Sequence, residues 1–335
     1  MSQKRILSVQ SHVVHGYVGN RVAAFPLQLL EWDVDVVNTV VFSNHTGYRQ
    51  WEGTRTSAQQ ILDLYAGLEK NTLTDYDVVL TGYIPDAASV RAMGTIVKKL
   101  RFENPRLVWV LDPVLGDENK LYVSADVVPA YRDVLLPMAT VITPNQFEAE
   151  MLTETKITAL DQIPDVLQKL HQRYKVKHVV ISSVVFEAGA TEFVCVGSSA
   201  RSDGTPRPFY LRLPFIDQYF TGTGDLFAAL LADRFHRYTN GNTVELADST
   251  PASELPLVSA VRDVSTIVQS VLRRTHQHVI DTQDRPVPAA LLSSYGMDAA
   301  KAKRIRDMKY GELQLISSQD AIRNPVVTVE AEYEF

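Results

Sequence analysis

The sequence predicts an α/β protein in which helices cover both faces of a central, mostly parallel β-sheet. Short segments rich in Val, Ile and Leu alternate with helix-length segments along the first half of the chain, and such alternation is typical of a doubly wound sheet. Several of the short segments are hydrophobic at consecutive positions, as strands are when both faces of their sheet are covered. We therefore expect a three-layer α/β/α sandwich.

The first half of the chain supplies the strands and helices of this pattern in alternation. The strands are predicted at Arg5–Gln10, Val34–Val41, Asp77–Thr81, Leu107–Leu111, Thr140–Thr143 and His178–Ser182. The helices are predicted at about 18–31, 55–70, 86–103, 124–136, 145–152 and 158–174. Asp86 and Ser124 stand at the start of two of these helices, and their short polar side chains favour the N-cap position.

The pattern changes after Ser183. A polar loop at 197–207 separates two short β-rich segments that we expect to pair, Glu192–Val196 and Pro208–Leu213. Further helices are predicted at 222–238, about 257–276 and about 299–307. The last segment, Val327–Phe335, alternates Glu with hydrophobic residues, which fits either an edge strand or a docked tail.

Length and composition favour a single domain over residues 1–335. A chain of 335 residues that is 45% hydrophobic can bury a large core, and no repeat or long linker divides it. Residues 239–256 are rich in Asn, Ser, Thr and Pro, which is typical of an exposed loop. We interpret this stretch as an insertion on the surface of the domain.

Charge and cysteine content exclude several classes of protein. The net charge is −6, with 33 basic and 39 acidic residues and no basic run, so we expect neither a nucleic-acid nor a membrane-surface partner. The one cysteine, Cys195, allows no intrachain disulfide and no thiolate metal cluster. No signal-peptide pattern and no apolar stretch of about 18–20 residues is present in the sequence. We expect a cytoplasmic protein, or one shared between cytoplasm and nucleus.

The most informative motif is Thr221-Gly222-Thr223-Gly224-Asp225, at the start of an apolar helix. The first N–H groups of a helix have no intrahelical partner and lie at the positive end of its dipole, so this end binds anions. Glycines let the backbone approach a phosphate closely, and an Asp beside such a cradle can take a proton from an alcohol. The motif suits phosphoryl transfer, although plain N-capping is the commoner use of such a sequence.

Polar residues also follow the predicted strands, where parallel sheets place their ligands. They form groups at Ser11–His12, Phe42–Tyr48, Gly82–Tyr83, Asp112–Asp117 and Pro144–Glu148. The sequence lacks the Gly-x-Gly-x-x-Gly motif of dinucleotide-dependent oxidoreductases and the Gly-x-x-x-x-Gly-Lys-Ser/Thr motif of P-loop ATPases. It also lacks the His-Glu-x-x-His and Cys-x-x-Cys patterns that predict a zinc site.

These segments resemble the pyridoxal kinases of the ribokinase-like superfamily. Gly-Thr-Gly-Asp at 222–225 and Thr-Pro-Asn at 143–145 are superfamily motifs, whereas Ser-Asn-His-Thr-Gly-Tyr at 43–48 and Gly-Tyr-Val-Gly-Asn at 16–20 are specific to the pyridoxal branch. The similarity extends from about residue 4 to 238 and more weakly to the C-terminus. It implies a ribokinase-like fold and ATP-dependent phosphorylation of the 5′-hydroxymethyl group of pyridoxal, pyridoxine and pyridoxamine.

The resemblance implies a role for each matching residue. Asp225 is expected to be the general base, and the amides of Gly222, Thr223 and Gly224 are expected to bind the migrating phosphoryl group. The vitamin is expected to contact Ser11, Phe42, His45, Thr46, Tyr83 and Asp225. ATP is expected to contact Asp112, Asn145, Ser182, Ser183, Tyr122, Gly222 and Thr223.

The resemblance also implies metal ions and a partner subunit. Mg²⁺ or another divalent cation is expected with ATP, and a monovalent cation, K⁺ or Na⁺, is a further expectation of the family. The candidate metal residues are Asp112, Asp117, Thr143 and Glu148. A homodimer is implied by the family alone.

Two alternatives remain open. A hydroxymethylpyrimidine kinase of the same superfamily would share the fold and the chemistry, but it gives no reason for the Ser-Asn-His-Thr-Gly-Tyr run at 43–48. A non-catalytic, vitamin-binding regulator on the same scaffold would not need Asp225 or the candidate metal carboxylates, all of which are present.

Overall fold

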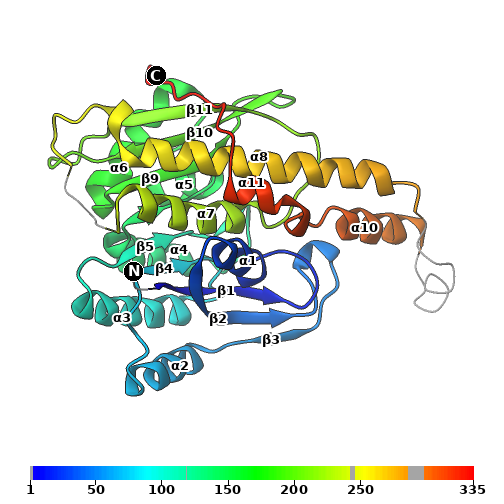
Figure 1. Ribbon diagram of the computed structural model, residues 1–335, viewed down its shortest axis with the longest axis horizontal. Helices are drawn as coiled ribbons and strands as arrows, with labels where there is room; N and C mark the ends of the chain where they lie inside the picture. Colours follow the sequence, from blue (N-terminus) through cyan, green and yellow to red (C-terminus); the bar gives the residue numbers. More distant parts are fainter. Residues whose placement is uncertain (1–2, 118, 242–245, 286–297) are drawn as a thin grey trace.

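The central sheet has more strands than the sequence predicts. A computed structural model describes residues 3–117, 119–241, 246–285 and 298–335. The described residues form a nine-stranded sheet with the order β11-β10-β9-β8-β5-β4-β1-β2-β3 (Figure 1). Its strands are β1 Lys4–Val13, β2 Trp32–Phe42, β3 Gly53–Arg55, β4 Val78–Thr81, β5 Val108–Leu111, β8 Val141–Ile142, β9 His178–Val184, β10 Glu192–Ser199 and β11 Pro208–Pro214.

The ladders in the middle of the sheet are parallel, and those at its edges are antiparallel. Each ladder from β9 through β8, β5, β4 and β1 to β2 is parallel, whereas β3, β10 and β11 join by antiparallel ladders. The prediction of a mostly parallel sheet is therefore confirmed. The predicted strand pair after residue 183 is also confirmed, with a register that runs from Glu192 opposite Pro214 to Ser198 opposite Pro208.

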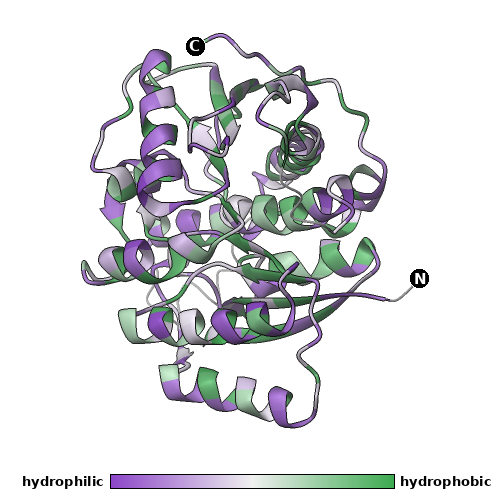
Figure 2. Cartoon of the chain, turned by 90° about the vertical axis from the view of Figure 1, so that its left-hand side faces the viewer, coloured by the Kyte–Doolittle hydropathy of each residue, from purple (hydrophilic) through white to green (hydrophobic). Residues whose placement is uncertain are grey.

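Successive side chains of the central strands enter two different hydrophobic cores, one on each face of the sheet. In β1, Leu7 joins one core and Ile6 the other; in β5, Trp109 and Val110 divide in the same way. Figure 2 shows hydrophobic colouring along the strands and mixed colouring on the helices around them. Burial on both faces explains why the strand sequences are hydrophobic at consecutive positions.

Helices cover both faces, and the α/β/α sandwich is confirmed. Buried residues of α2 to α6 join the core of Leu7, whereas those of α1, α7, α8 and α11 join the core of Ile6. Figure 1 shows α7 and α8 crossing the sheet next to each other. The helices are α1 Asn20–Leu29, α2 Ala58–Lys70, α3 Ala87–Glu103, α4 Val127–Ala130, α5 Gln146–Thr153, α6 Ile163–Tyr174, α7 Thr223–Tyr238, α8 Pro256–Thr282, α10 Ala299–Tyr310 and α11 Gln319–Arg323.

The two N-cap predictions have opposite outcomes. Asp86 accepts the N–H of Ser89 at 2.8 Å and caps α3, as expected. The prediction for Ser124 is wrong, because α4 begins at Val127 and the Val127 N–H bonds to the backbone carbonyl of Ser124 at 3.0 Å. The chain enters α4 through a turn, so Ser124 lies two residues before the N-cap position, which Asp126 occupies.

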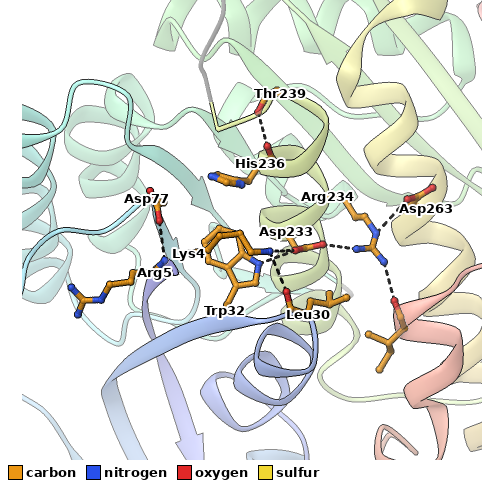
Figure 3. Close-up of polar contacts among 11 residues, drawn as sticks. Lys4, Arg5, Leu30, Trp32, Asp77, Asp233, Arg234, His236, Thr239 and Asp263 are labelled. Carbon is orange, nitrogen blue, oxygen red and sulfur yellow. Dashed lines mark hydrogen bonds and ion pairs between the residues drawn. The ribbon is translucent and has the colours of Figure 1, made fainter. Parts of the chain in front are cut away.

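A buried network of charges fixes α7 against its neighbours (Figure 3). The Arg234 guanidinium pairs with Asp233 and Asp263 and donates to the carbonyl of Ile322 in α11 at 2.9 Å. Asp233 also accepts the indole N–H of Trp32, in β2, at 2.8 Å. Removing one partner of a buried ion pair leaves an uncompensated charge and costs about 3–5 kcal/mol. The network therefore holds α7, and with it the start of this helix, in a fixed place on the sheet.

The segment 239–256 is described only in part, since 242–245 lie outside the described residues. The described part is tied to the loop between β10 and β11: Arg207 donates to the carbonyls of Ala247 at 2.9 Å and Thr250 at 3.2 Å. At the end of the chain, Glu332 forms a two-bond backbone bridge with Tyr210 of β11. Of the two alternatives for this end, a docked tail is correct.

None of the helices in the described ranges combines the length and the hydrophobicity needed to cross a membrane.

Candidate active site

The N-terminus of α7 is open toward a cavity. Gly222 occupies the N-cap position with φ 82° and, having no side chain, leaves the first N–H groups of the helix without a side-chain cap. A Cβ at Gly222 would lie 2.0 Å from the Tyr17 carbonyl oxygen, so only glycine fits. The Thr223 hydroxyl is buried and has no hydrogen-bond partner among the described residues. These unpaired donors make the helix start suitable for an anion.

Asp225 lies in the first turn of α7, and the loop between β1 and α1 holds its carboxylate. Its Oδ2 accepts the N–H of Gly19 at 2.8 Å. Burial raises the pKa of Asp225 to about 6, although the hydrogen bond from Gly19 lowers it. A carboxylate with a pKa of this size is ionised at neutral pH and still accepts a proton readily, which a general base requires.

The cavity has a volume of about 320 Å³ and opens where β5, β8 and β9 end. It brings together all the residues that the sequence assigns to the phosphoryl group, the nucleotide and the metal. The residues of this set that line it are Asp112, Asp117, Tyr122, Thr143, Asn145, Glu148, Ser182, Ser183, Gly222, Thr223, Gly224 and Asp225.

Two buried carboxyl groups give the cavity its electrostatic character. Asp112 is 5% exposed and Glu148 is 4% exposed. Burial raises the pKa of Asp112 well above its usual range, and the charges of Glu148 and Asp225 raise it further. Burial also raises the pKa of Glu148 to about 8, although backbone N–H groups lower it. A cation beside these two groups would stabilise their ionised forms.

Asn145 and Glu148 also shape the loop that carries Asp112. They form a capping box at the start of α5, in which each side chain accepts the backbone N–H of the other at 2.8 Å. Glu148 Oε1 accepts the N–H of Leu115 at 2.9 Å, and Asn145 Nδ2 donates to the carbonyl of Gly116 at 2.9 Å. Both carboxylate oxygens of Glu148 therefore already bond to the backbone.

The donor set fits Mg²⁺ only together with phosphate. Within the described ranges, no group of three or more His, Cys, Asp or Glu side chains is placed to hold a metal ion by itself. Mg²⁺ is commonly bound by one or two carboxylates while waters and substrate phosphates complete its shell. Asp112, Glu148 and the phosphates of a nucleotide in the cavity would give such a set.

The far end of the cavity is mostly hydrophobic but also contains buried polar side chains, among them Ser265 and Gln269. Its lining includes Phe193, Leu213, Phe220, Val268 and Leu272. Gln269 of α8 lies among them with 3% exposure; its Nε2 donates to the Pro214 carbonyl at 3.2 Å, and its Oε1 has no partner among the described residues. No residue for the adenine base is predicted from the sequence. A Gln within the hydrophobic face of a predicted helix is the signal that could have pointed to Gln269.

Of the residues expected to contact the vitamin, Asp225 lines this cavity, whereas the others lie around the ends of β1, β2 and β4, outside its described lining. These others are Ser11, Phe42, His45, Thr46 and Tyr83. Ser11 is brought close to Asp225 through Gly19, because a Cβ at Gly19 would lie 2.1 Å from the Ser11 carbonyl oxygen. For Phe42, Thr46 and Tyr83 the structure gives no comparable contact with Asp225.

Hydrogen bonds to backbone carbonyls hold the loop of Gly82 and Tyr83. One of them comes from Tyr131, a residue that is not predicted from the sequence. The Tyr83 carbonyl accepts the hydroxyl of Thr39 at 2.7 Å, and burial raises the pKa of the Tyr83 phenol. Tyr131 donates its hydroxyl to the Gly82 carbonyl at 3.3 Å. Burial raises the pKa of Tyr131 well above its usual range, and the charge of Asp112 adds to this. Tyr131 thus joins the loop of Tyr83 to the carboxylate end of the cavity.

Glu312, which follows α10, is another residue that is not predicted from the sequence. Its Oε1 lies 3.1 Å from His45 Nε2 and accepts the hydroxyl of Tyr48 at 3.1 Å. Its Oε2 accepts the N–H of Tyr17 at 2.8 Å. No local sequence pattern marks this residue, because all three partners lie in the first 48 positions of the chain.

The comparison with known protein families gives the class of protein to which this chain belongs. The profile of the phosphomethylpyrimidine kinase family matches residues 34–249. The matched part runs from β2 through β11 and α7, so it contains the start of α7 and the carboxylates of the cavity. The chain therefore belongs to a class of kinases, as the motifs indicate.

Individual relatives narrow this class. The pyridoxal kinase of Arabidopsis thaliana is 40% identical over 98% of this chain and 94% of its own length, and that of Bos taurus is 37% identical over 98% and 97%. The structure of pyridoxal kinase from Leishmania donovani in complex with ADP and pyridoxine matches with a TM-score of 0.79 and 31% identity, over 98% of this chain and 99% of that one. The chain belongs to the pyridoxal kinase family, which confirms the resemblance.

Proposed function

We propose that this protein transfers the γ-phosphoryl group of ATP to the 5′-hydroxymethyl group of pyridoxal, pyridoxine and pyridoxamine. The observation that carries the proposal is Asp225, which lies in the cavity beside the uncapped start of α7. The relatives support the substrates, since they are pyridoxal kinases and the Leishmania donovani protein forms a complex with ADP and pyridoxine.

In the proposed reaction Asp225 is the general base. Its carboxylate takes the proton of the hydroxymethyl group, whose oxygen bonds to the γ-phosphorus while the bond to the β–γ bridging oxygen breaks and ADP leaves. The N–H of Gly19, at 2.8 Å, orients the carboxylate. The amides of Gly222, Thr223 and Gly224 stabilise the negative charge on the phosphoryl oxygens as it moves.

We place the nucleotide in the cavity described above. Its proposed contacts are Asp112, Asn145, Ser182, Ser183, Tyr122, Gly222 and Thr223. When bound, Mg²⁺ would neutralise phosphate charge; the residues proposed to hold it, or a monovalent K⁺ or Na⁺, are Asp112, Asp117, Thr143 and Glu148. The raised pKa values of Asp112 and Glu148 support a cation there.

The direct test is ATP consumption with pyridoxal as acceptor, run beside hydroxymethylpyrimidine, ribose and adenosine, with Mg²⁺ and K⁺ present. Turnover on pyridoxal with the absorbance of pyridoxal phosphate supports the proposal. The second candidate is a hydroxymethylpyrimidine kinase, which the name of the matching family profile favours; it requires turnover on that alcohol instead. Binding of pyridoxal without any turnover would support a regulator.

Two substitutions test the vitamin side. Tyr83→Ala and Thr46→Val should raise KM for pyridoxal about three- to tenfold, because each removes a hydroxyl that is proposed to contact the vitamin. KM for ATP should change less than twofold, since neither residue lies among the described lining of the nucleotide cavity. Steady-state kinetics with each substrate varied in turn measures both values. Thr158→Val, an exposed threonine outside that lining, is the control. An effect on KM for ATP alone would contradict the assignment.

Three further properties belong to the same proposal. We propose one kinase domain over 1–335 with the insertion at 239–256, because the tail at Glu332 returns to β11 of the same sheet. We propose a homodimer, a family property that light scattering tests. We propose a cytoplasmic protein with no nucleic-acid partner, in keeping with a net charge of −6, which fractionation of cells tests.

A further inference from the structure

Glu312 connects two loops that the sequence places far away from it. The side chain is 6% exposed, and it contacts His45 and Tyr48 after β2 and Tyr17 after β1. It also fills the space beside Gly16, where a Cβ would lie 2.5 Å from Glu312 Oε1. Burying a carboxylate costs free energy unless its oxygens accept hydrogen bonds. Here both oxygens of Glu312 have partners.

The carboxylate determines which nitrogen of the His45 ring carries hydrogen. Burial raises the pKa of Glu312, but its contacts with His45, Tyr17 and Tyr48 outweigh this and hold the pKa below its usual value. An ionised carboxylate can only accept hydrogen bonds. His45 Nε2, at 3.1 Å from Oε1, must therefore carry the hydrogen.

Glu312 does not engage the other nitrogen of the His45 ring, Nδ1. His45 is 6% exposed, and its Nδ1 is buried without a hydrogen-bond partner in the part of the chain that the structure describes. When Nε2 carries the hydrogen of the neutral ring, Nδ1 has a lone pair and is an acceptor. A buried acceptor without a partner costs free energy, which a bound donor would recover.

We propose that Glu312 is a positioning residue for vitamin recognition, because it holds His45 with Nδ1 as the acceptor for a hydroxyl group of the B6 vitamin. This inference rests on the proposed function. The same carboxylate holds the N–H of Tyr17, two residues before Gly19, whose own N–H orients Asp225. Glu312 thus positions the His45 ring, which we propose recognises the vitamin. It also positions Tyr17, at the start of the loop that carries Gly19, whose N–H bonds to the proposed base Asp225.

The test is Glu312→Gln, which keeps the size of the side chain and makes one of its two oxygens a donor. The Tyr17 N–H cannot change, so the amide oxygen stays with it and the amide NH₂ faces His45. The ring must then move its hydrogen from Nε2 to Nδ1, which becomes a donor. We expect KM for pyridoxal to rise about tenfold, while KM for ATP and kcat change less than twofold.

Nitrogen NMR of histidine-labelled protein gives an independent readout, since the two tautomers have different ¹⁵N shifts. The signal of His45, identified by its loss in His45→Asn, should report hydrogen on Nε2 in the wild type and on Nδ1 in Glu312→Gln. In a His45→Ala background, Glu312→Gln should have no further effect on KM for pyridoxal, because the ring through which Glu312 acts is gone.

Glu332→Gln is the matched control. Glu332 also accepts a tyrosine hydroxyl, that of Tyr210 at 2.7 Å, but it lies at β11 on the far edge of the sheet, and its variant should keep both KM values. Unchanged KM for pyridoxal in Glu312→Gln, an equal rise for ATP, or an effect that persists without His45 would overturn the inference. A wild type that does not phosphorylate pyridoxal would instead refute the proposed function.

Discussion

Asp225→Asn should lower kcat about 10²–10⁴-fold while pyridoxal still binds. The amide keeps the shape of the carboxylate, and its oxygen can still accept the N–H of Gly19, which now bonds to Oδ2 at 2.8 Å. It cannot take the proton of the hydroxymethyl group. Steady-state kinetics measures the loss of turnover, and fluorescence titration measures the affinity for pyridoxal. Asp217→Asn, at an exposed carboxyl before the same helix, should keep full activity.

The dependence of the rate on pH tests the same group without a mutation. Burial raises the pKa of Asp225 to about 6, and only the ionised form can act as a base. The kcat/KM of the wild type should therefore fall as the pH decreases through about 6 and stay level just above it. Asp225→Asn should lack this decrease. Near-normal turnover in the variant would remove Asp225 from the role of base.

Removal of divalent cations should abolish turnover. The phosphates of ATP would enter a cavity that already contains Asp112 and Glu148, both buried, and the ionised forms of these groups would repel the phosphates strongly in such surroundings unless a cation lay between them. An excess of EDTA should reduce pyridoxal phosphorylation to background, and added Mg²⁺ should restore it. Activity that survives thorough chelation would contradict the role proposed for these carboxyl groups.

The same carboxyl groups predict how stability depends on pH in the absence of metal. A carboxyl group whose pKa is raised by folding binds its proton more tightly in the folded state, so its contribution to stability is present below the unfolded pKa and lost as the pH rises through the folded pKa. For Glu148 this interval runs from 4.5 to about 8. The free energy of unfolding should fall across it. At pH 8 without metal, Asp112→Asn should be more stable than the wild type, because burial disfavours the ionised carboxyl, whereas Asn neither carries a charge nor has to bind a proton to be buried.

The fold is predicted well where burial is two-sided and poorly where elements are short. The segments around Trp109 and Val180 are hydrophobic at several consecutive positions because helices cover both faces, and this pattern needs no tertiary information. The edge strand Gly53–Arg55 is exposed at all three residues, so no hydrophobic pattern marks it. The hairpin of β6 Gly116–Asp117 and β7 Lys120–Leu121 has only two residues in each strand, too few for any periodicity.

The sequence predicts those residues of the candidate site that the order of the strands brings together. Asp112 and Asn145 follow neighbouring parallel strands and therefore meet at one edge of the sheet. Gln269 and Glu312 come from a helix and a loop that pack over this edge from a distance, and no rule of strand order places them. Their roles, like those of the other site residues, remain predictions until the variants above are measured.

The position of Glu312 has a consequence for the order in which the protein is assembled on the ribosome. The described residues that line the nucleotide cavity end at Leu272, whereas Tyr17 and His45 are synthesised among the first and must wait for Glu312. Translation delivers the chain from its N-terminus. The described lining of the proposed nucleotide pocket is thus synthesised before Glu312, the carboxylate that joins the two loops proposed to bind the vitamin, so the proposed vitamin site is completed later than this lining.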